Sequence, residues 1–98
     1  MPTYVVLAQF TDQGLRDLGN FVTRARENQA RLQAANLKIT GPYLTMGEYD
    51  QVAIIEAPDE LTALRALVGI LGQGNIRTRT LHAYTLDEAA QALSSQTG

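Results

Sequence analysis

The segment Gly47-Glu48-Tyr49-Asp50 carries the residues of this 98-residue chain whose types and spacing most suggest chemistry. A phenol next to a carboxylate at the mouth of a pocket could act as a hydrogen-bonding or acid–base pair. The alternative is a structural role, in which Gly47 makes a turn, Tyr49 packs over the end of a sheet, and the Asp50 carboxylate accepts backbone N–H bonds. We favour the structural interpretation and keep Tyr49 and Asp50 as candidate site residues.

A second candidate group lies in the segment Arg77-Thr78-Arg79-Thr80, where arginine and threonine alternate. An arginine in this position could clamp a carboxylate or phosphate with two parallel hydrogen bonds. Charged residues on an edge strand also prevent further strand pairing, and an arginine could instead pair with Asp50 or Glu56. We favour the structural interpretation for Arg79 and leave Arg77 open between the two.

His82 is the only histidine of the chain. A metal site would need further imidazoles or a carboxylate cluster near it, and the sequence shows neither. His82 is therefore a structural residue in our preferred interpretation and a catalytic one in the alternative. Gln9 lies on an otherwise apolar segment, where a buried amide must be hydrogen-bonded or must line a cavity. The candidate ligand-binding residues are Gln9, Tyr43, Thr45, Tyr49, Asp50, Arg77, Thr78, Thr80 and His82.

Composition narrows the function classes. The eight Lys and Arg against ten Asp and Glu give a net charge of −2, whereas nucleic-acid binders normally carry a strong basic excess. The chain has no cysteine, which excludes disulfides and thiolate sites. No phosphate loop, dinucleotide fingerprint or Gly-x-Ser-x-Gly motif is present, so we expect no cofactor and no metal. The absence of a signal peptide or of an apolar run of ~18 residues predicts a cytoplasmic protein that contacts neither nucleic acid nor membrane.

The residue pattern predicts a single domain with four strands and at least three helices. We expect strands at residues 3–10, 37–46, 49–57 and 75–84. We expect a tight two-residue reversal at Gly47 and Glu48 between the second and third of these, and an interruption of the second strand at Gly41-Pro42. A helix is expected to break near Gly19 and to continue from about residue 21 to 35, and further helices should begin near residues 58 and 85. Residues 94–98 are expected to form a frayed tail.

Apolar spacing predicts which helix and strand faces are buried. In the helix after residue 58 the expected buried stripe consists of Leu61, Leu64, Leu67, Val68 and Leu71; in the first helical region it consists of Leu15, Leu18, Val22, Ala25, Gln29 and Leu32. The strands at 3–10 and 49–57 carry apolar residues on both faces, which predicts that they are central.

The predicted order is β-α-β-β-α-β with an additional C-terminal helix, the α+β arrangement of ferredoxin-like domains with sheet order 4-1-3-2. Two helices cover only one face of such a sheet. The other apolar face needs a partner, and a second copy related by a two-fold axis supplies one. We therefore expect a homodimer in which two sheets pack face to face as a dimeric α+β barrel.

The sequence resembles the GYD domain family of small bacterial and archaeal proteins. The matching segments are residues 2–6, 10–14, 43–50, 53–59 and 74–81, and the name derives from Gly47, Tyr49 and Asp50 of the third of these. The resemblance implies the dimeric α+β barrel and little about chemistry, because the family is described as being of unknown function. Two departures, His82 where an arginine is expected and the Gly19-Asn20-Phe21 segment, weaken the transfer of an anion-binding role.

The leading functional hypothesis is a homodimeric binding module that holds a small organic or anionic ligand near residues 47–50. One alternative is a cofactor-independent enzyme such as a monooxygenase, isomerase or lyase, which rests on fold analogy alone. Another is an assembly module that binds no ligand. The catalytic alternative requires Tyr49 or His82 within hydrogen-bond reach of a second titratable group.

Overall fold

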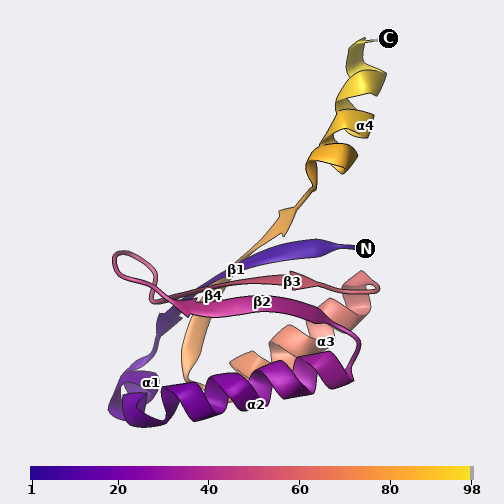
Figure 1. Cartoon of the computed structure of the whole chain (residues 1–98). Coiled ribbons are helices and arrows are strands. Elements are labelled where there is room, and N and C mark those ends of the chain that lie inside the picture. Colours follow the sequence, from indigo (N-terminus) through magenta and orange to yellow (C-terminus); the bar gives the residue numbers. More distant parts are fainter. Residues whose placement is uncertain (98) are drawn as a thin grey trace.

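The computed structural model describes residues 1–97 and has two layers, a four-stranded antiparallel sheet and helices packed on one of its faces (Figure 1). The strands and helices, in chain order, are β1 (Thr3–Phe10), α1 (Asp12–Arg16), the short 3-10 helix η1 (Leu18–Asn20), α2 (Phe21–Ala34), β2 (Lys38–Leu44), β3 (Gln51–Glu56), α3 (Glu60–Leu71), β4 (Ile76–Ala83) and α4 (Leu86–Thr97). This is an α+β chain with the predicted element types.

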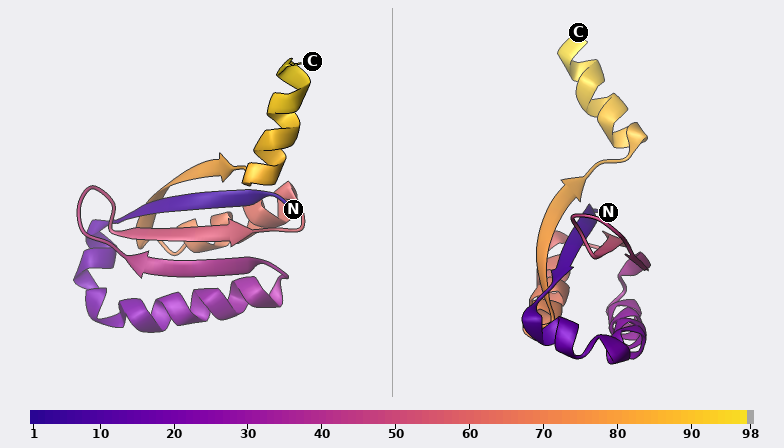
Figure 2. Two further views of the ribbon diagram at one scale, coloured as in Figure 1. Left: turned by 45° about the horizontal axis from the view of Figure 1, so that its top comes forward. Right: turned by 90° about the vertical axis from the view of Figure 1, so that its left-hand side faces the viewer.

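The sheet has the strand order β2-β3-β1-β4, which read from the other edge is β4-β1-β3-β2. In the antiparallel register Val6 lies opposite Ala53 on one side and Thr80 on the other. Helices α2 and α3 cover the face of the sheet that carries Val6, and no described element covers the opposite face (Figures 1 and 2). We call this opposite face the open face.

The core lies between the covered face of the sheet and the two long helices. Alternate residues of β1 and β3 point into it, as expected for strands packed on helices. The buried apolar residues are Val6, Ala8, Phe10, Leu32, Leu37, Ala53, Ile55, Ala57 and Ala63. Because most of these side chains are small, the core of one chain is modest in volume.

Side chains cap three of the helices. Thr11 caps α1 by accepting a hydrogen bond from the Gly14 N–H at 3.1 Å, and the backbone N–H groups of residues 85 and 88 close a reciprocal capping box at α4. Asp59 caps α3 by accepting the Thr62 N–H at 2.7 Å. The hydrogen bonds from Thr62 lower the pKa of the Asp59 carboxyl below its ordinary value.

Two predicted irregularities are confirmed. The first helical region divides at Leu18–Asn20, next to Gly19, and α2 begins at Phe21. The pairing of β2 with β3 shifts register between Thr40 and Tyr43, where Gly41 and Pro42 form a bulge on an edge strand. An edge position tolerates a proline because the missing N–H faces away from the neighbouring strand.

The predicted two-residue reversal at Gly47 and Glu48 is wrong. β2 ends at Leu44 and β3 begins at Gln51, so a six-residue loop, residues 45–50, joins them. The Thr45 N–H donates to the Asp50 carbonyl oxygen at 2.7 Å and closes the base of this loop. Gly47 does have the positive φ expected of a turn, +109°.

The predicted buried stripes of the helices are only partly correct. On α3, Leu67 packs on the core together with Ala63, Ala66 and Ile70, whereas Leu61, Leu64, Val68 and Leu71 are exposed. We call these four exposed residues the α3 stripe. In the first helical region Leu32 is buried but Leu15, Leu18 and Val22 are exposed. Ala63 and Ala66 let α3 approach the sheet closely, and Leu67 and Ile70 fill the space beside them, so the other leucines lie on the outer side.

Helix α4 projects from the end of β4, away from α2 and α3 and on the side of the sheet that these helices leave open (Figures 1 and 2). Its Leu86 is 88% exposed and its Leu93 is 64% exposed. Of the tail that we expected at residues 94–98, the backbone is helical through Thr97 and Gly98 lies outside the described residues, so its fraying stays a prediction. No helix in residues 1–97 is long and apolar enough to cross a membrane.

Candidate functional site

The loop at residues 45–50 is held to the end of β1 by the side chain of Asp50. Its Oδ2 accepts the backbone N–H of Phe10 at 2.8 Å, and its own N–H donates to the Ala8 carbonyl oxygen at 2.9 Å. Thr45 Oγ1 donates to the Tyr49 carbonyl oxygen at 2.6 Å within the loop. The structural interpretation of Asp50 is confirmed: its carboxylate fixes the loop to the neighbouring strand.

Gln9 and Tyr49 line a groove beside this loop on the open face. The Gln9 amide donates to the Glu48 carbonyl oxygen at 2.9 Å. The other residues of the groove are Arg77, Thr78 and Arg79 of β4, and its volume is about 260 Å³. Neither arginine forms an ion pair within the described chain, where the ion pairs are Arg24–Asp17 and Lys38–Glu56. We call this the arginine groove; its two free guanidinium groups suit a carboxylate or another anion.

The remaining sequence candidates lie elsewhere. Tyr43 is on the open face opposite Val52 of β3 and is 58% exposed. Thr80 and His82 share the covered side of β4, because alternate residues of a strand point to opposite faces. The structure therefore brings Gln9, Tyr49, Arg77 and Arg79 together and separates Tyr43, Thr80 and His82 from them. Thr78 borders the arginine groove but shares the covered side of β4 with Thr80 and His82.

His82 lies between two tyrosines. Its ring centroid is 4.9 Å from that of Tyr4 and 4.8 Å from that of Tyr84. Stacking of this kind stabilises the end of the sheet from which α4 departs. Within the described residues, no three His, Cys, Asp or Glu side chains are grouped so as to hold a metal ion.

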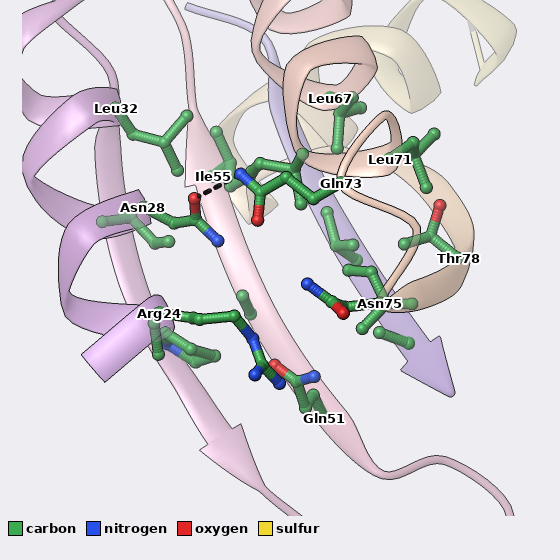
Figure 3. A pocket seen from close by; sticks show the side chains of 18 of the residues that line it. Arg24, Asn28, Leu32, Gln51, Ile55, Leu67, Leu71, Gln73, Asn75 and Thr78 are labelled. Carbon is green, nitrogen blue, oxygen red and sulfur yellow. Dashed lines mark hydrogen bonds between the residues drawn. The ribbon is translucent and has the colours of Figure 1, made fainter. Parts of the chain in front are cut away.

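A second pocket lies between the covered face of the sheet and helices α2 and α3 (Figure 3). Its cavity volume is about 80 Å³ and its walls are mainly apolar, with Phe10 and Phe21 in edge-to-face contact at a centroid distance of 5.6 Å. We call it the interlayer pocket. Thr78 is the only sequence candidate that lines it.

Polar side chains gather at one side of the interlayer pocket: Arg24 and Asn28 from α2, Gln51 from β3, and Gln73 and Asn75 from the connection between α3 and β4. Figure 3 shows the Arg24 guanidinium beside the Gln51 amide. Gln51 is 9% exposed and is the buried polar residue of the described chain. An apolar pocket with a few converging polar groups is the usual form of a small-molecule site.

Sequence reasoning missed these five polar residues. Arg24 and Asn28 are four residues apart and so share one side of a helix, a pattern that could have indicated a polar patch beside the apolar stripe. Gln73 and Asn75 belong to the segment Gly72-Gln73-Gly74-Asn75, which has no phosphate-loop lysine. Nothing in the sequence places these two segments opposite each other, since that proximity arises from the packing of α2 and α3 on one sheet.

Comparison with known proteins gives one family and one curated relative. The model of the GYD domain family matches residues 4–93. A protein of Thermus thermophilus, named "Glutamine synthetase and cystathionine beta-lyase binding protein", is 34% identical over 84 residues, which cover 85% of this chain and 88% of the relative. No solved structure matches the chain.

Proposed function

The chain belongs to the GYD domain family, and from this and its exposed surfaces we propose that it is a small binding protein that works as a homodimer and attaches to a larger enzyme. The observation that carries the proposal is that an apolar open face and an uncovered α4 lie on the same side of the molecule. The name of the Thermus relative supports an enzyme as the partner. The expected cytoplasmic location stays a prediction.

The centre of the open face is apolar. It is formed by Val5, Leu7, Val52, Ile54 and Leu81, of which Ile54 is 38% and Leu81 is 53% exposed. Exposed apolar surface of this kind, bordered by charged residues such as Arg79 and the Lys38–Glu56 pair, is typical of a protein interface. Two copies packed through this face would form the ferredoxin-like dimeric α+β barrel.

The size of the face indicates that α4 takes part in the dimer. Four strands spaced ~4.8 Å apart and about eight residues long span roughly 19 by 26 Å, or about 500 Å² per protomer. A stable interface buries about 800 Å² per partner. Helix α4 is 12 residues long and exposes Leu86 and Leu93, and an isolated helix of this length is only marginally stable in water. The α3 stripe of the second copy lies on a helix that is also 12 residues long, and it offers α4 an apolar surface.

The arginine groove is the surface that we assign to the enzyme partner. The groove lies at the end of the sheet next to the loop at residues 45–50, where Gln9 of β1 is opposite Arg77 of β4. When two sheets pack through their centres, the groove therefore lies at the edge of the interface. Two arginines without an internal partner can hold carboxylates of another protein with paired hydrogen bonds. A small anionic ligand in the same groove is the second candidate, favoured by the same free guanidinium groups.

The catalytic alternative gains no support from these contacts. It required Tyr49 or His82 within hydrogen-bond reach of a second titratable group, and within the described residues neither side chain makes such a bond.

The test measures mass and binding separately. Sedimentation equilibrium at micromolar concentration gives the oligomeric state, and biolayer interferometry measures binding to purified glutamine synthetase and to purified cystathionine β-lyase. We expect the Arg77→Glu/Arg79→Glu variant to remain dimeric and to lose enzyme binding. The matched control is Arg26→Glu/Arg31→Glu on the outer side of α2, which makes the same change in charge and should bind like the wild type.

Two results would contradict the assignment. If the groove variant binds both enzymes as tightly as the wild type, the partner surface lies elsewhere. If the wild-type chain binds neither enzyme but the groove variant loses affinity for inorganic phosphate or citrate, the groove serves a small anion, which is the second candidate.

A further inference from the structure

Gln51 is a buried residue, and its side-chain amide has no hydrogen-bond partner in the described chain. The residue is 9% exposed, and although its backbone pairs with Ala8 in the sheet, no protein group bonds its amide. No side-chain nitrogen or oxygen of the described residues is both buried and unpaired, so the unbonded Gln51 amide is open to the pocket, where a ligand or water can bond it. Its place on the wall of the interlayer pocket, beside Arg24, lets a molecule in the pocket bond this amide (Figure 3).

The Arg24 guanidinium is held by Asp17, but only one of its three nitrogens donates hydrogen bonds within the described residues. Its Nη1 donates to Asp17 Oδ2 at 2.6 Å and to the Asp17 carbonyl oxygen at 2.8 Å. No other hydrogen bond of this guanidinium forms within the described residues, and the side chain is 18% exposed. Asp17 therefore holds the guanidinium in place, while Nε and Nη2 have no hydrogen-bond partner within the described residues.

The orientation of the Asn75 amide follows from its neighbours. The Gln13 amide donates to the Gln73 carbonyl oxygen at 3.0 Å, so the donating atom is the nitrogen Nε2. The same nitrogen bonds to Asn75 Oδ1 at 3.1 Å, which must therefore be oxygen. Asn75 consequently turns its Nδ2 donors into the pocket, as Figure 3 shows.

The polar side of the pocket is thus rich in donors, and its one cationic group among the described residues is Arg24, which also pairs with Asp17. Asn28 adds to it, since its Oδ1 accepts from Gln73 Nε2 at 3.0 Å and its own Nδ2 stays free. No aspartate or glutamate lines the pocket. The walls away from Arg24 and Gln51 are apolar and include Leu32, Ile55 and Leu67 (Figure 3). This distribution matches a molecule with an acceptor-only, negatively charged end and a short hydrocarbon end.

We propose that the interlayer pocket binds a short organic carboxylate, with the carboxylate held by Arg24, Asn75 and Gln51 and the hydrocarbon chain lying against Leu32, Ile55 and Leu67. The cavity volume of about 80 Å³ corresponds to about half a dozen ordered waters, at roughly 10–15 Å³ each on the same measure. A molecule of the size of butyrate fits this volume. Inorganic phosphate fits less well, because it would leave the apolar walls without contact and would place two charges against one guanidinium.

The test is a titration of the full chain with butyrate, and with butyramide as the uncharged molecule of the same shape, followed by ¹H–¹⁵N NMR. Saturable shifts with roughly millimolar affinity are expected for butyrate, concentrated at the amides of residues 24–28, 51 and 75. Butyramide should bind about tenfold more weakly or less. Arg24→Lys, which keeps a charge for Asp17 but lacks the second row of donors, and Gln51→Leu should each weaken butyrate binding about tenfold. Arg26→Lys, on the exposed side of the same helix, is the matched control and should bind like the wild type.

Each contrary result overturns a stated part of the proposal. An absence of saturable shifts with acetate, propionate and butyrate overturns the site, and equal binding of butyramide overturns the role of charge. Wild-type affinity in both pocket variants overturns the assignment of the holding residues. Gln51→Leu should also melt no lower than the wild type without ligand, and a clearly lower midpoint would show that the amide has a structural partner.

The pocket is built from one protomer, so its occupancy does not depend on the proposed dimer or on enzyme binding. Butyrate should bind equally to an Ile54→Lys variant in which the open face is blocked. Failure of the dimer therefore leaves this result unchanged, and failure of butyrate binding leaves the dimer unchanged.

Discussion

Replacing Asp50 by alanine should destabilise the fold even though the residue lies in a loop. Asp50 Oδ2 accepts the Phe10 N–H at 2.8 Å, and Phe10 itself is buried. Alanine at position 50 leaves this N–H without a partner next to the core. A hydrogen bond to a charged acceptor contributes about 1.5–3 kcal/mol, and an unsatisfied buried donor costs about 1–3 kcal/mol. We therefore expect a loss of about 2 kcal/mol in the free energy of unfolding.

The assay is equilibrium unfolding in urea together with a thermal melt at fixed protein concentration, because dimerisation makes the midpoint depend on concentration. A loss of about 2 kcal/mol lowers the midpoint of a domain of this size by about 10 °C. Asp50→Asn keeps a neutral oxygen acceptor and should lose about half as much. Glu48→Ala is the control in the same loop and should match the wild type, since within the described residues Glu48 bonds another side chain only through its carbonyl oxygen. Equal stability of Asp50→Ala and Glu48→Ala would refute the reasoning.

Three further predictions follow from the geometry. Asp59→Ala removes the cap of α3 and should lower the melting midpoint at neutral pH. Because the folded-state pKa of Asp59 is depressed, this stabilisation exists above the unfolded-state pKa and should disappear as the pH falls through the folded-state pKa, which a pH series of melts checks. Gly14→Ala should lower the free energy of unfolding in urea by about 1–3 kcal/mol, because the new Cβ would overlap the Asn75 carbonyl oxygen. A Cβ at Gly19 has no neighbouring atom to overlap, so Gly19→Ala should leave the free energy of unfolding nearly unchanged. Deletion of the chain after Tyr84 should leave a folded protein by circular dichroism and raise the dimer dissociation constant in sedimentation experiments, and an unchanged constant would exclude α4 from the interface.

Much of the fold could be predicted from local chemistry. The helix start near residue 58, the break near Gly19 and the interruption at Gly41-Pro42 all depend on residues close in sequence, and the structure confirms them. The apolar residues on both faces of β1 and β3 correctly predicted that these strands are central. Such features are predictable because each is decided within a few residues.

The wrong predictions concern features that tertiary packing determines. The α3 stripe satisfies helical spacing as well as the true buried face does, and periodicity alone cannot choose between two apolar faces of one helix. The loop at residues 45–50 is longer than a two-residue turn because Asp50 is held by β1, a contact across 40 positions in the chain. Local turn rules contain no information about such a contact.

The candidate site shows the same division. Alternation along β4 correctly separates Arg77 and Arg79 from Thr80 and His82 in the sequence, since strand residues alternate between faces. The polar residues of the interlayer pocket could not have been predicted from such local patterns. Arg24, Gln51 and Asn75 come from three segments that meet only after α2 and α3 pack on the sheet.

The mass of the chain in solution tests the central claim most directly. Sedimentation equilibrium at micromolar concentration should give twice the chain mass of 10.7 kDa, and Ile54→Lys, which places a charge at the centre of the open face, should shift the mass to that of one chain while leaving the circular dichroism spectrum unchanged. A wild-type mass of 10.7 kDa at the same concentration would contradict the proposal that the open face and α4 join two copies.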